Sequence, residues 1–236
     1  MSKERIADLV RLLIAEIGED PNREGLRDTP ERVAELYSEI FAGYAASAEL
    51  EVSFAEESRL VALHDIEFYS VCEHHLLPFF GKAHIVYEPN GRVYGASKIV
   101  RLIEKFTRRL QVQERITSQI AEELVERGAK GSLVILEAEH LCMKMRGVRN
   151  GGSLVTSAEC GSLQNAALRA EALQIMGGYA KSGWRGSIQA RRPHPEESIA
   201  TEEKTLGVHG PRFSAVTERE PAPVEAGVRD NTDYEA

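Results

Sequence analysis

The sequence predicts a globular chain in which α-helices and β-strands are mixed, and three observations lead to this fold class. Of the 236 residues, 42% are hydrophobic, which is enough to form a core. Apolar residues recur at helical spacing near the N-terminus and again after residue 97. Residues 60–69 and 79–87 instead alternate and are rich in β-branched and aromatic side chains, as strands are. The length allows one large domain or two small ones.

The first 46 residues are expected to form two helices. In residues 3–17 the apolar side chains fall on one helix face, and Gly18 ends the pattern. Asp28 then provides an N-cap and Pro30 a proline suited to the first helical turn, so a second helix is expected from about Pro30 to Tyr44. Residues 1–46 are therefore expected to be an N-terminal helical segment.

Residues 47–182 are expected to hold the main domain, and residues 183–236 a tail. The expected elements are, in order, strands at 60–69 and 79–87, helices from 97 to about 110 and from 116 to about 125, strands near 133–139 and 154–157, and a helix near 164–176. Beyond Ser182 few large apolar residues remain, and such a composition cannot offset the entropic cost of ordering the chain. The tail is therefore expected to be disordered.

Charge and cysteine content exclude several classes of protein. A net charge of −8 disfavours nonspecific binding to nucleic acid or to anionic membranes, because both are polyanions. No stretch approaches the roughly 20 apolar residues that a membrane span needs. Three cysteines are too few for a disulfide framework, which favours a reducing compartment, although one disulfide stays an alternative. We expect a cytoplasmic protein that binds neither membranes nor nucleic acid.

Two pairs of residues have the spacing of metal ligands. Cys72 and His75 lie three positions apart, and His140 and Cys142 would point to the same face of an extended strand. The alternative is a set of separate core cysteines and hydrogen-bonded histidines, which is the commoner situation for any one such residue taken alone. The two pairs together favour a metal site.

The metal site has two forms that the spacing leaves open. A structural site would use all four groups, whereas a catalytic site would use three and leave one position for water. His74 stands directly beside His75, and a structural zinc site needs no such extra imidazole. A hydrolytic site does need a group with a pKa near ~6.5 to move protons. The second histidine therefore favours the catalytic form.

The helix expected from Ser97 has basic residues opposite its apolar face. They are Lys98, Arg101, Lys105 and either Arg108 or Arg109. An ordinary solvated helix face would look the same. Ser97, however, lies at the expected helix N-terminus, where free N–H groups and the helix dipole favour an anion beside these cations. A phosphate-bearing substrate is therefore expected, and Arg146 is a further cation that follows Cys142 closely.

The sequence resembles the type I GTP cyclohydrolase family in four segments that occur in the family's order, namely Ser70–Phe79, Gly95–Arg101, Gln111–Arg115 and His140–Gly147. The upstream segment Asp28–Val33 is also similar to the family. The resemblance extends over about residues 3–180 and leaves the tail outside. Departures from the family pattern occur at Gly151–Leu154 and Glu159–Ser162, and neither removes a candidate site residue.

The resemblance implies a role for each residue that matches these segments. Zn²⁺ would be held by Cys72, His75 and Cys142, with water in the fourth position, and His74 and His140 would be acid/base groups. Glu114 would accept hydrogen bonds from the guanine N1–H and amino group, and Gln113 would help to orient the substrate. The ribose-triphosphate side would be bound by Ser97, Lys98, Arg101 and Arg146, with Arg32 a further candidate.

The resemblance also implies an activity, a fold and an assembly. GTP would be opened hydrolytically at C8, formate released and the product reclosed as 7,8-dihydroneopterin triphosphate, the first step of tetrahydrofolate and pterin biosynthesis. The fold would be an α+β tunnelling fold (T-fold), in which the antiparallel sheet of residues 47–182 carries packed helices and joins the strands of neighbouring subunits. The assembly would be a homodecamer with its sites between subunits.

Three alternatives are weighed against this activity. The nitrile reductase of the queuosine pathway shares the fold but lacks this zinc set, so the presence of Cys72, His75 and Cys142 together disfavours it. A non-catalytic, zinc-stabilised nucleotide-binding module would use His140 as a fourth ligand. A cyclohydrolase that feeds a deazapurine pathway would perform identical chemistry, and the sequence does not separate it from one that serves folate synthesis.

Overall fold

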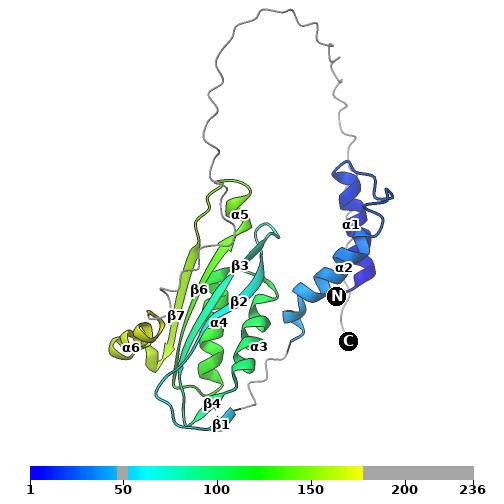
Figure 1. The fold of residues 1–236 in the computed structure, drawn as a ribbon. Helices are drawn as coiled ribbons and strands as arrows, with labels where there is room; N and C mark the ends of the chain where they lie inside the picture. Colours follow the sequence, from blue (N-terminus) through cyan, green and yellow to red (C-terminus); the bar gives the residue numbers. More distant parts are fainter. Residues whose placement is uncertain (47–52, 178–236) are drawn as a thin grey trace, which may run out of the picture. The chain divides into compact units, whose positions relative to one another are not determined.

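The structure is a computed structural model that describes residues 1–46 and 53–177, and a five-stranded sheet forms its centre (Figure 1). The strand order is β5-β2-β3-β6-β7. Neighbouring long strands are antiparallel, and only the short β5 runs parallel to β2. The strands are β2 (Val61–Cys72), β3 (Pro78–Glu88), β5 (Leu110–Gln111), β6 (Gly131–His140) and β7 (Leu154–Gly161). The expectation of a mixed α and β fold with an antiparallel sheet is confirmed.

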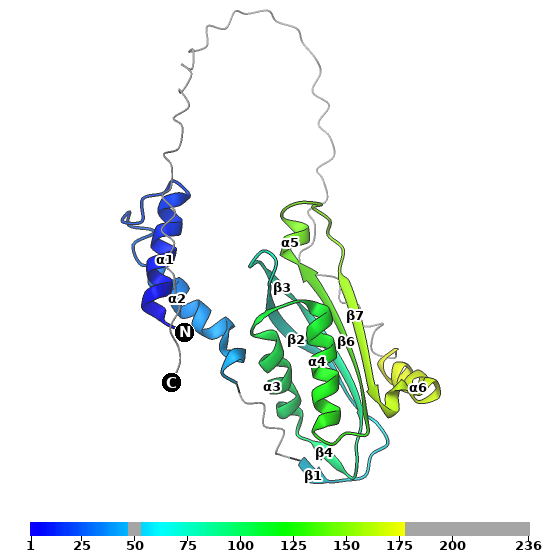
Figure 2. The same cartoon turned by 180° about the vertical axis from the view of Figure 1, so that it is seen from behind.

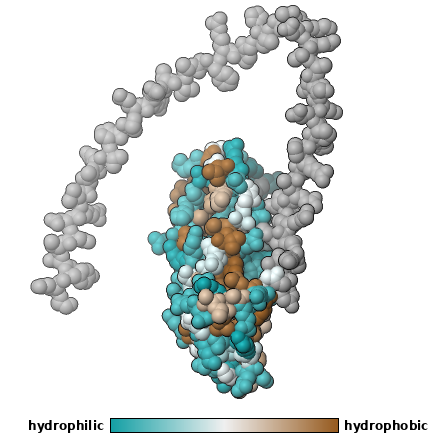
Figure 3. All heavy atoms as spheres, turned by 90° about the vertical axis from the view of Figure 1, so that its left-hand side faces the viewer, coloured by the Kyte–Doolittle hydropathy of each residue, from teal (hydrophilic) through white to brown (hydrophobic). Residues whose placement is uncertain are grey.

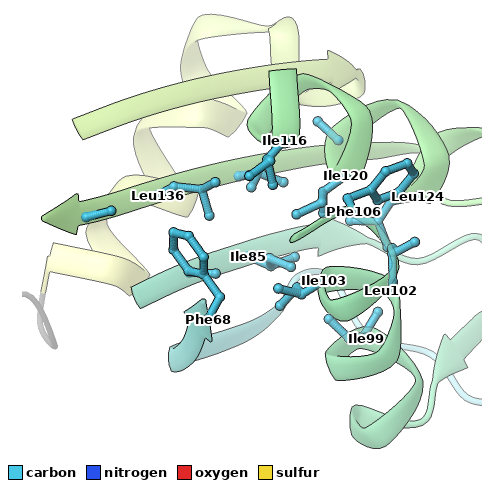
Figure 4. Packing of buried hydrophobic residues seen from close by; sticks show 14 of the residues in the cluster. Phe68, Ile85, Ile99, Leu102, Ile103, Phe106, Ile116, Ile120, Leu124 and Leu136 are labelled. Atoms are coloured by element: carbon cyan, nitrogen blue, oxygen red, sulfur yellow. The ribbon is translucent and has the colours of Figure 1, made fainter. Parts of the chain in front are cut away.

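Two helices, α3 (Ala96–Thr107) and α4 (Gln113–Glu126), cover one face of the sheet and lie side by side in Figure 2. Their apolar residues recur every three or four positions, so one stripe of each helix faces the strands. The stripe residues are Ile99, Leu102, Ile103 and Phe106 of α3 and Ile116, Ile120 and Leu124 of α4 (Figure 4). They pack against alternate strand residues such as Phe68, Ile85 and Leu136. This main core fixes the two helices on the sheet.

The opposite face of the sheet is covered by α6 (Ala166–Gly177) together with the short η2 (Ser162–Gln164). A second, smaller core forms there from Val86, Leu133, Leu163, Ala172 and Met176. Hydrophobic surface is visible on the side of the molecule that carries α6 and β7 (Figure 3). Val155 of β7 and Leu173 of α6 are among the exposed apolar residues.

The N-terminal residues form the expected helix pair, α1 (Lys3–Glu16) and α2 (Thr29–Ile40), followed by the 3₁₀ turn η1 (Ala42–Tyr44). Gly43 of η1 lies against the end of α3, where its N–H donates to the Arg108 carbonyl and its own carbonyl accepts from the Arg109 guanidinium. A Cβ at Gly43 would lie 2.5 Å from the Lys105 carbonyl oxygen, so only glycine permits this approach.

Most expected elements are present, with shifted ends. The second helix ends at Ile40 rather than near Tyr44, and α4 begins at Gln113 rather than at Ile116. Short elements were not expected, namely β1 (Ser53–Ala55), β4 (Arg92–Tyr94), β5 and the one-turn helix α5 (Leu141–Lys144). The division into residues 1–46, 47–182 and 183–236 stays a prediction, and the tail lies outside the described residues. Within the described part, no helix is long and apolar enough to cross a membrane.

Candidate metal and acid–base site

The loop between β2 and β3 presents the first two metal-ligand candidates. Cys72 is the last residue of β2, and its N–H donates to the Leu77 carbonyl across the loop. The Leu76 N–H donates back to the Cys72 carbonyl, and Leu76 takes a left-handed conformation with φ of 54° to close the turn. Cys72 is buried as a result, whereas His74 and His75 are exposed.

The third ligand candidate reaches the same place from β6. β3 pairs with both β2 and β6, and its first residues lie beside the last residues of each, since Pro78 pairs with Val71 and Phe79 with His140. Both strand ends therefore meet at one end of the sheet. Cys142 is not on the strand: the chain turns into α5 after His140, so the expectation that His140 and Cys142 share a strand face is wrong. With Cys142 in this helical turn, its Sγ lies 3.9 Å from Sγ of Cys72.

The three side chains fit a single metal ion. The ligand atoms of Cys72, His75 and Cys142 all lie within 4.8 Å of one another. The two sulfur atoms are 3.9 Å apart, close to the value of about 3.8 Å that two thiolates of a tetrahedral zinc ion would have at 2.3 Å each. Burial raises the pKa of the Cys142 thiol, with a further contribution from Cys72, so the pair of thiolates needs a cation beside it.

His140 lies outside this group of three. Its side chain is 8% exposed, and its ring stacks on Phe79 with centroids 4.5 Å apart and planes within 5°. Nε2 lies 2.9 Å from Oε1 of Gln113. Burial lowers the pKa of His140 below its ordinary value of 6.5, and the Glu114 carboxylate in the first turn of α4 acts in the opposite direction. Stacking on Phe79 and the contact with Gln113 therefore fix the position of the His140 ring.

His74 is the more accessible of the two acid–base candidates. It is exposed in the β2–β3 loop, and its Nδ1 lies 3.7 Å from Sγ of Cys72. The rings of His74 and His75 have centroids 6.4 Å apart. The two histidines beside the thiol pair thus differ: one is buried and fixed, and the other is in contact with solvent.

Arg115 and Glu73 form an ion pair that sequence reasoning did not find. The Arg115 guanidinium donates to both oxygens of Glu73, at 2.6 and 3.1 Å, and so ties the loop of His74 and His75 to α4. This contact lowers the pKa of Glu73. Both residues fall within the segments used for the resemblance, but no spacing rule indicates that two residues 42 positions apart will meet.

The candidate phosphate-binding residues divide between the two ends of the sheet. Arg146 follows α5 and contacts Nε2 of His75, at the end that holds the cysteines. Ser97 and Lys98 lie at the start of α3, just after β4, where the Tyr94 N–H donates to the hydroxyl of Tyr87. Tyr87 is the second-to-last residue of β3, whereas Cys72 lies beside the first residues of that strand.

A single chain therefore does not bring all the candidate residues together. β3 has 11 residues, which at about 3.3 Å each places its two ends about 33 Å apart. Arg101 lies one turn further along α3 and is exposed. Arg32 belongs to α2 and pairs with Asp28 at 3.1 Å. Glu114 and Gln113 lie at the cysteine end, because α4 starts directly after β5 pairs with Cys72.

Comparison with known proteins gives one consistent family. A family model described as GTP cyclohydrolase I matches residues 6–177. The GTP cyclohydrolase 1 of Carboxydothermus hydrogenoformans is 51% identical over 184 residues, which covers 75% of this chain and 96% of that protein. That of Hyperthermus butylicus is 49% identical over 178 residues, with 75% and 92% covered. That of Bifidobacterium longum is 52% identical over 180 residues, with 74% and 90% covered.

Proposed function

Because the chain belongs to the GTP cyclohydrolase I family, we propose that it opens GTP hydrolytically at C8, releases formate and recloses the product as 7,8-dihydroneopterin triphosphate. The observation that carries this proposal is the arrangement at the end of β2 and β6. Three metal-ligand side chains converge there, and a buried histidine stands next to them without joining them.

The proposed metal is Zn²⁺, held by Cys72, His75 and Cys142. Two thiolates and an imidazole are ligands that zinc prefers, and three protein ligands leave one position for water, as in catalytic zinc sites. When bound, the ion would lower the pKa of a coordinated water toward about 7 and so supply a nucleophile at neutral pH. His140 is engaged by Gln113 instead, which supports the three-ligand site over a closed structural one.

The proposed proton transfers belong to His140 and His74. Opening of the imidazole ring requires a proton on the ring nitrogen that leaves C8, and a histidine is suited to give it near neutral pH. His140 is fixed and buried, so it suits a step in which geometry must be held. His74 is exposed and suits exchange of protons with water.

Glu114 is the proposed reader of the guanine base. It is exposed in the first turn of α4, and its charge acts against the burial that lowers the pKa of His140. A carboxylate can accept hydrogen bonds from N1–H and the 2-amino group of guanine together. Adenine offers no such pair of donors and would leave the carboxylate unpaired, which is how a site rejects the wrong base.

The triphosphate is proposed to be bound by residues of two copies of the chain. Ser97, Lys98 and Arg101 lie at the end of the sheet far from Cys72, so they complete a site only if they come from a neighbouring subunit. Within the described residues, the side chains of Lys98 and Arg101 take part in no ion pair, which leaves both cations available for an anion. Arg146 would add a cation from the subunit that holds the metal.

This division supports the homo-oligomer that the resemblance implies. We propose a T-fold assembly in which the sheets of neighbouring subunits join, with sites between subunits. The decamer and Arg32 as a further phosphate ligand are predictions of the same resemblance, whereas the cytoplasmic location is the expectation drawn from cysteine content and the absence of a long apolar stretch. The pathway that receives the product, for folate, other pterins or deazapurines, is a matter of the cell's other enzymes because the chemistry at this site is identical.

The test is to incubate metal-analysed protein with GTP and to measure formate and the fluorescence of the oxidised pterin. We expect one zinc per chain and stoichiometric release of formate and pterin. Stoichiometric zinc with GTP binding but no formate would instead establish the zinc-stabilised nucleotide-binding module.

A further inference from the structure

We propose that Gln113 is a positioning residue that keeps the ring proton of His140 on Nε2, so that Nδ1 is the nitrogen left for proton transfer. The inference rests on the proposed function, in which His140 is an acid–base group. It assigns to Gln113 a role different from the direct substrate contact that the family resemblance implies. The argument comes from the hydrogen bonds that surround the Gln113 amide.

The orientation of this amide is determined by two backbone carbonyls. The Nε2 atom of Gln113 lies 3.0 Å from the Leu136 oxygen of β6 and 2.9 Å from the Leu154 oxygen of β7. A backbone carbonyl can only accept a hydrogen bond, so the NH₂ end of the amide must face these two oxygens. The reverse orientation would place three oxygens against one another. Oε1 therefore faces His140, at 2.9 Å from its Nε2.

Two threonine hydroxyls support the same orientation. Thr117 donates to the Gln113 backbone carbonyl at 2.7 Å, which uses its only proton. Thr156 lies 2.6 Å from the Thr117 hydroxyl and must therefore be the donor in that pair. Its own oxygen is then free to share, at the longer distance of 3.2 Å, one of the two Nε2 protons of Gln113 that the carbonyls also accept. The bonds run in one direction around a closed ring, from the Gln113 amide through Thr156 and Thr117 to the Gln113 backbone.

The tautomer of His140 follows from this orientation. Oε1 of Gln113 has no hydrogen to give, so the bond to His140 exists only if Nε2 carries the proton. A neutral imidazole with its proton on Nε2 has its lone pair on Nδ1. The stacking of the ring on Phe79 holds the plane in which that lone pair lies. Gln113 thus determines which nitrogen is the base, as hydrogen-bond partners of catalytic histidines do.

Direct contact between Gln113 and a substrate does not fit the same observations. The side chain is 0% exposed, and both ends of its amide already have partners within the chain. Glu114, the next residue, is exposed and available to a ligand. The two neighbours at the start of α4 therefore have different roles: Glu114 binds the guanine base, and Gln113 orients His140.

The first experiment reads the tautomer itself. Magic-angle-spinning NMR of the zinc-loaded oligomer with ¹⁵N-labelled histidine distinguishes protonated from unprotonated Nε2 and Nδ1. The chain has seven histidines, and the His140 signal is assigned by its loss in His140→Asn. We expect neutral His140 to carry its proton on Nε2 alone. A proton on Nδ1 in the unaltered protein would overturn the proposal, whatever the variants do.

The second experiment removes the acceptor and keeps the volume. Gln113→Met should lose the exclusive Nε2–H signature and lower kcat by about 10- to 100-fold, with KM for GTP and zinc content nearly unchanged. A matched control is Gln111→Met, since Gln111 is also buried and its amide donates to the Phe106 carbonyl rather than engaging His140. This control should keep the Nε2–H form. A higher KM with unchanged kcat and tautomer in Gln113→Met would show direct substrate binding and would overturn the proposal.

The outcomes separate this inference from the proposed function. If the unaltered protein releases no formate from GTP, the proposed function fails, but the tautomer measurement still decides whether Gln113 orients His140. If formate is released and His140 is protonated on Nδ1, the function stands and the role of Gln113 is refuted. If Gln113→Met does not fold, the tautomer of the unaltered protein alone decides.

Discussion

The two ends of the same sheet are built in different ways. At the end that holds Cys72 and Cys142, the side chains of Cys72, Gln113 and His140 are buried, and those of Gln113 and His140 are oriented by hydrogen bonds within the chain. At the end that holds Ser97 and Lys98, the candidate ligands are solvated residues on the first turn of a helix. A reaction centre needs fixed geometry before substrate arrives, whereas a triphosphate can be gathered by cations that become ordered on binding. We infer that the first end performs the chemistry and the second supplies affinity.

Removal of the metal ligands should have the largest effect on activity. Cys72→Ala and Cys142→Ala should lose zinc and fall to background turnover, because two ligands hold the ion poorly. His140→Ala should keep zinc and lose about 10²- to 10⁴-fold in kcat, the usual contribution of an acid–base group. Metal analysis beside a formate assay measures both. Loss of zinc from His140→Ala as complete as that from Cys142→Ala would favour the closed four-ligand site.

Recovery of activity when two inactive variants are combined in one oligomer would show that each site uses the metal end of one subunit and the phosphate end of another. One chain carries Cys142→Ala, and the other carries Ser97→Ala, Lys98→Ala and Arg101→Ala together. Co-expressed under different tags and purified through both, the mixed oligomer should regain part of the activity at low GTP concentration, because some sites combine two intact halves. The control is a mixture of the two separately purified oligomers, measured before their subunits exchange. Mixed oligomers that stay inactive would place the whole site within one chain.

Single changes at the phosphate end should have a smaller effect that is confined to binding. Lys98→Ala or Arg101→Ala should weaken GTP binding by roughly 1–3 kcal/mol, the range for one charge-assisted contact, and leave zinc content unchanged. Competition by inorganic triphosphate checks the cause. Triphosphate should still bind to Glu114→Ala, which lacks only the guanine contact, and bind poorly to Arg101→Ala. Equal affinity in both variants would mean that the basic residues of α3 are an ordinary solvated face.

The smallest expected effect concerns the middle of the sheet, where His84 lies on β3 between the two ends. Burial lowers its pKa below 6.5, while Asp65 and Glu137 act to raise it and His64 and Lys82 to lower it. The unfolded chain then binds the proton more readily than the folded one, so the stability is complete above about pH 6.5 and declines as the pH falls through the lower folded pKa. Thermal unfolding from pH 7.5 to 5 should show a shallower decline in His84→Gln. An identical decline in both proteins would assign the pH dependence to other groups.

At the metal end, the sequence predicted which residues are candidate ligands, but it did not predict the short elements that carry them. The three-residue spacing of Cys72 and His75 was enough to indicate a ligand pair, because a tight turn between two strands keeps such residues together. Cys142 was placed on a strand by its two-residue spacing from His140, but α5 is only four residues long and too short for any periodic pattern. β5, with two residues, escapes detection for the same reason.

Contacts between distant elements are what the sequence could not predict. The orientation of Gln113 depends on the carbonyls of Leu136 and Leu154, which lie 23 and 41 positions away and come together only when β6 and β7 pair. The separation of Ser97 from Cys72 is likewise a property of the folded sheet. The resemblance implied sites between subunits, but which candidate residues lie at which end of the sheet became visible only from the topology.

The helix α3 connects these two ends along the chain, so its length limits which insertions the protein can tolerate. It starts with Ser97 and Lys98 and delivers the chain to β5, whose Gln111 pairs with Cys72. Each residue inserted into α3 would add about 1.5 Å and turn everything beyond it by about 100°. Arg101 and the helix N-terminus would then change their distance from β5, which holds Gln111, and point in a different direction. Solvent-facing residues of α3 other than the proposed phosphate ligands can vary, but the number of residues in the helix is constrained by the elements that it connects.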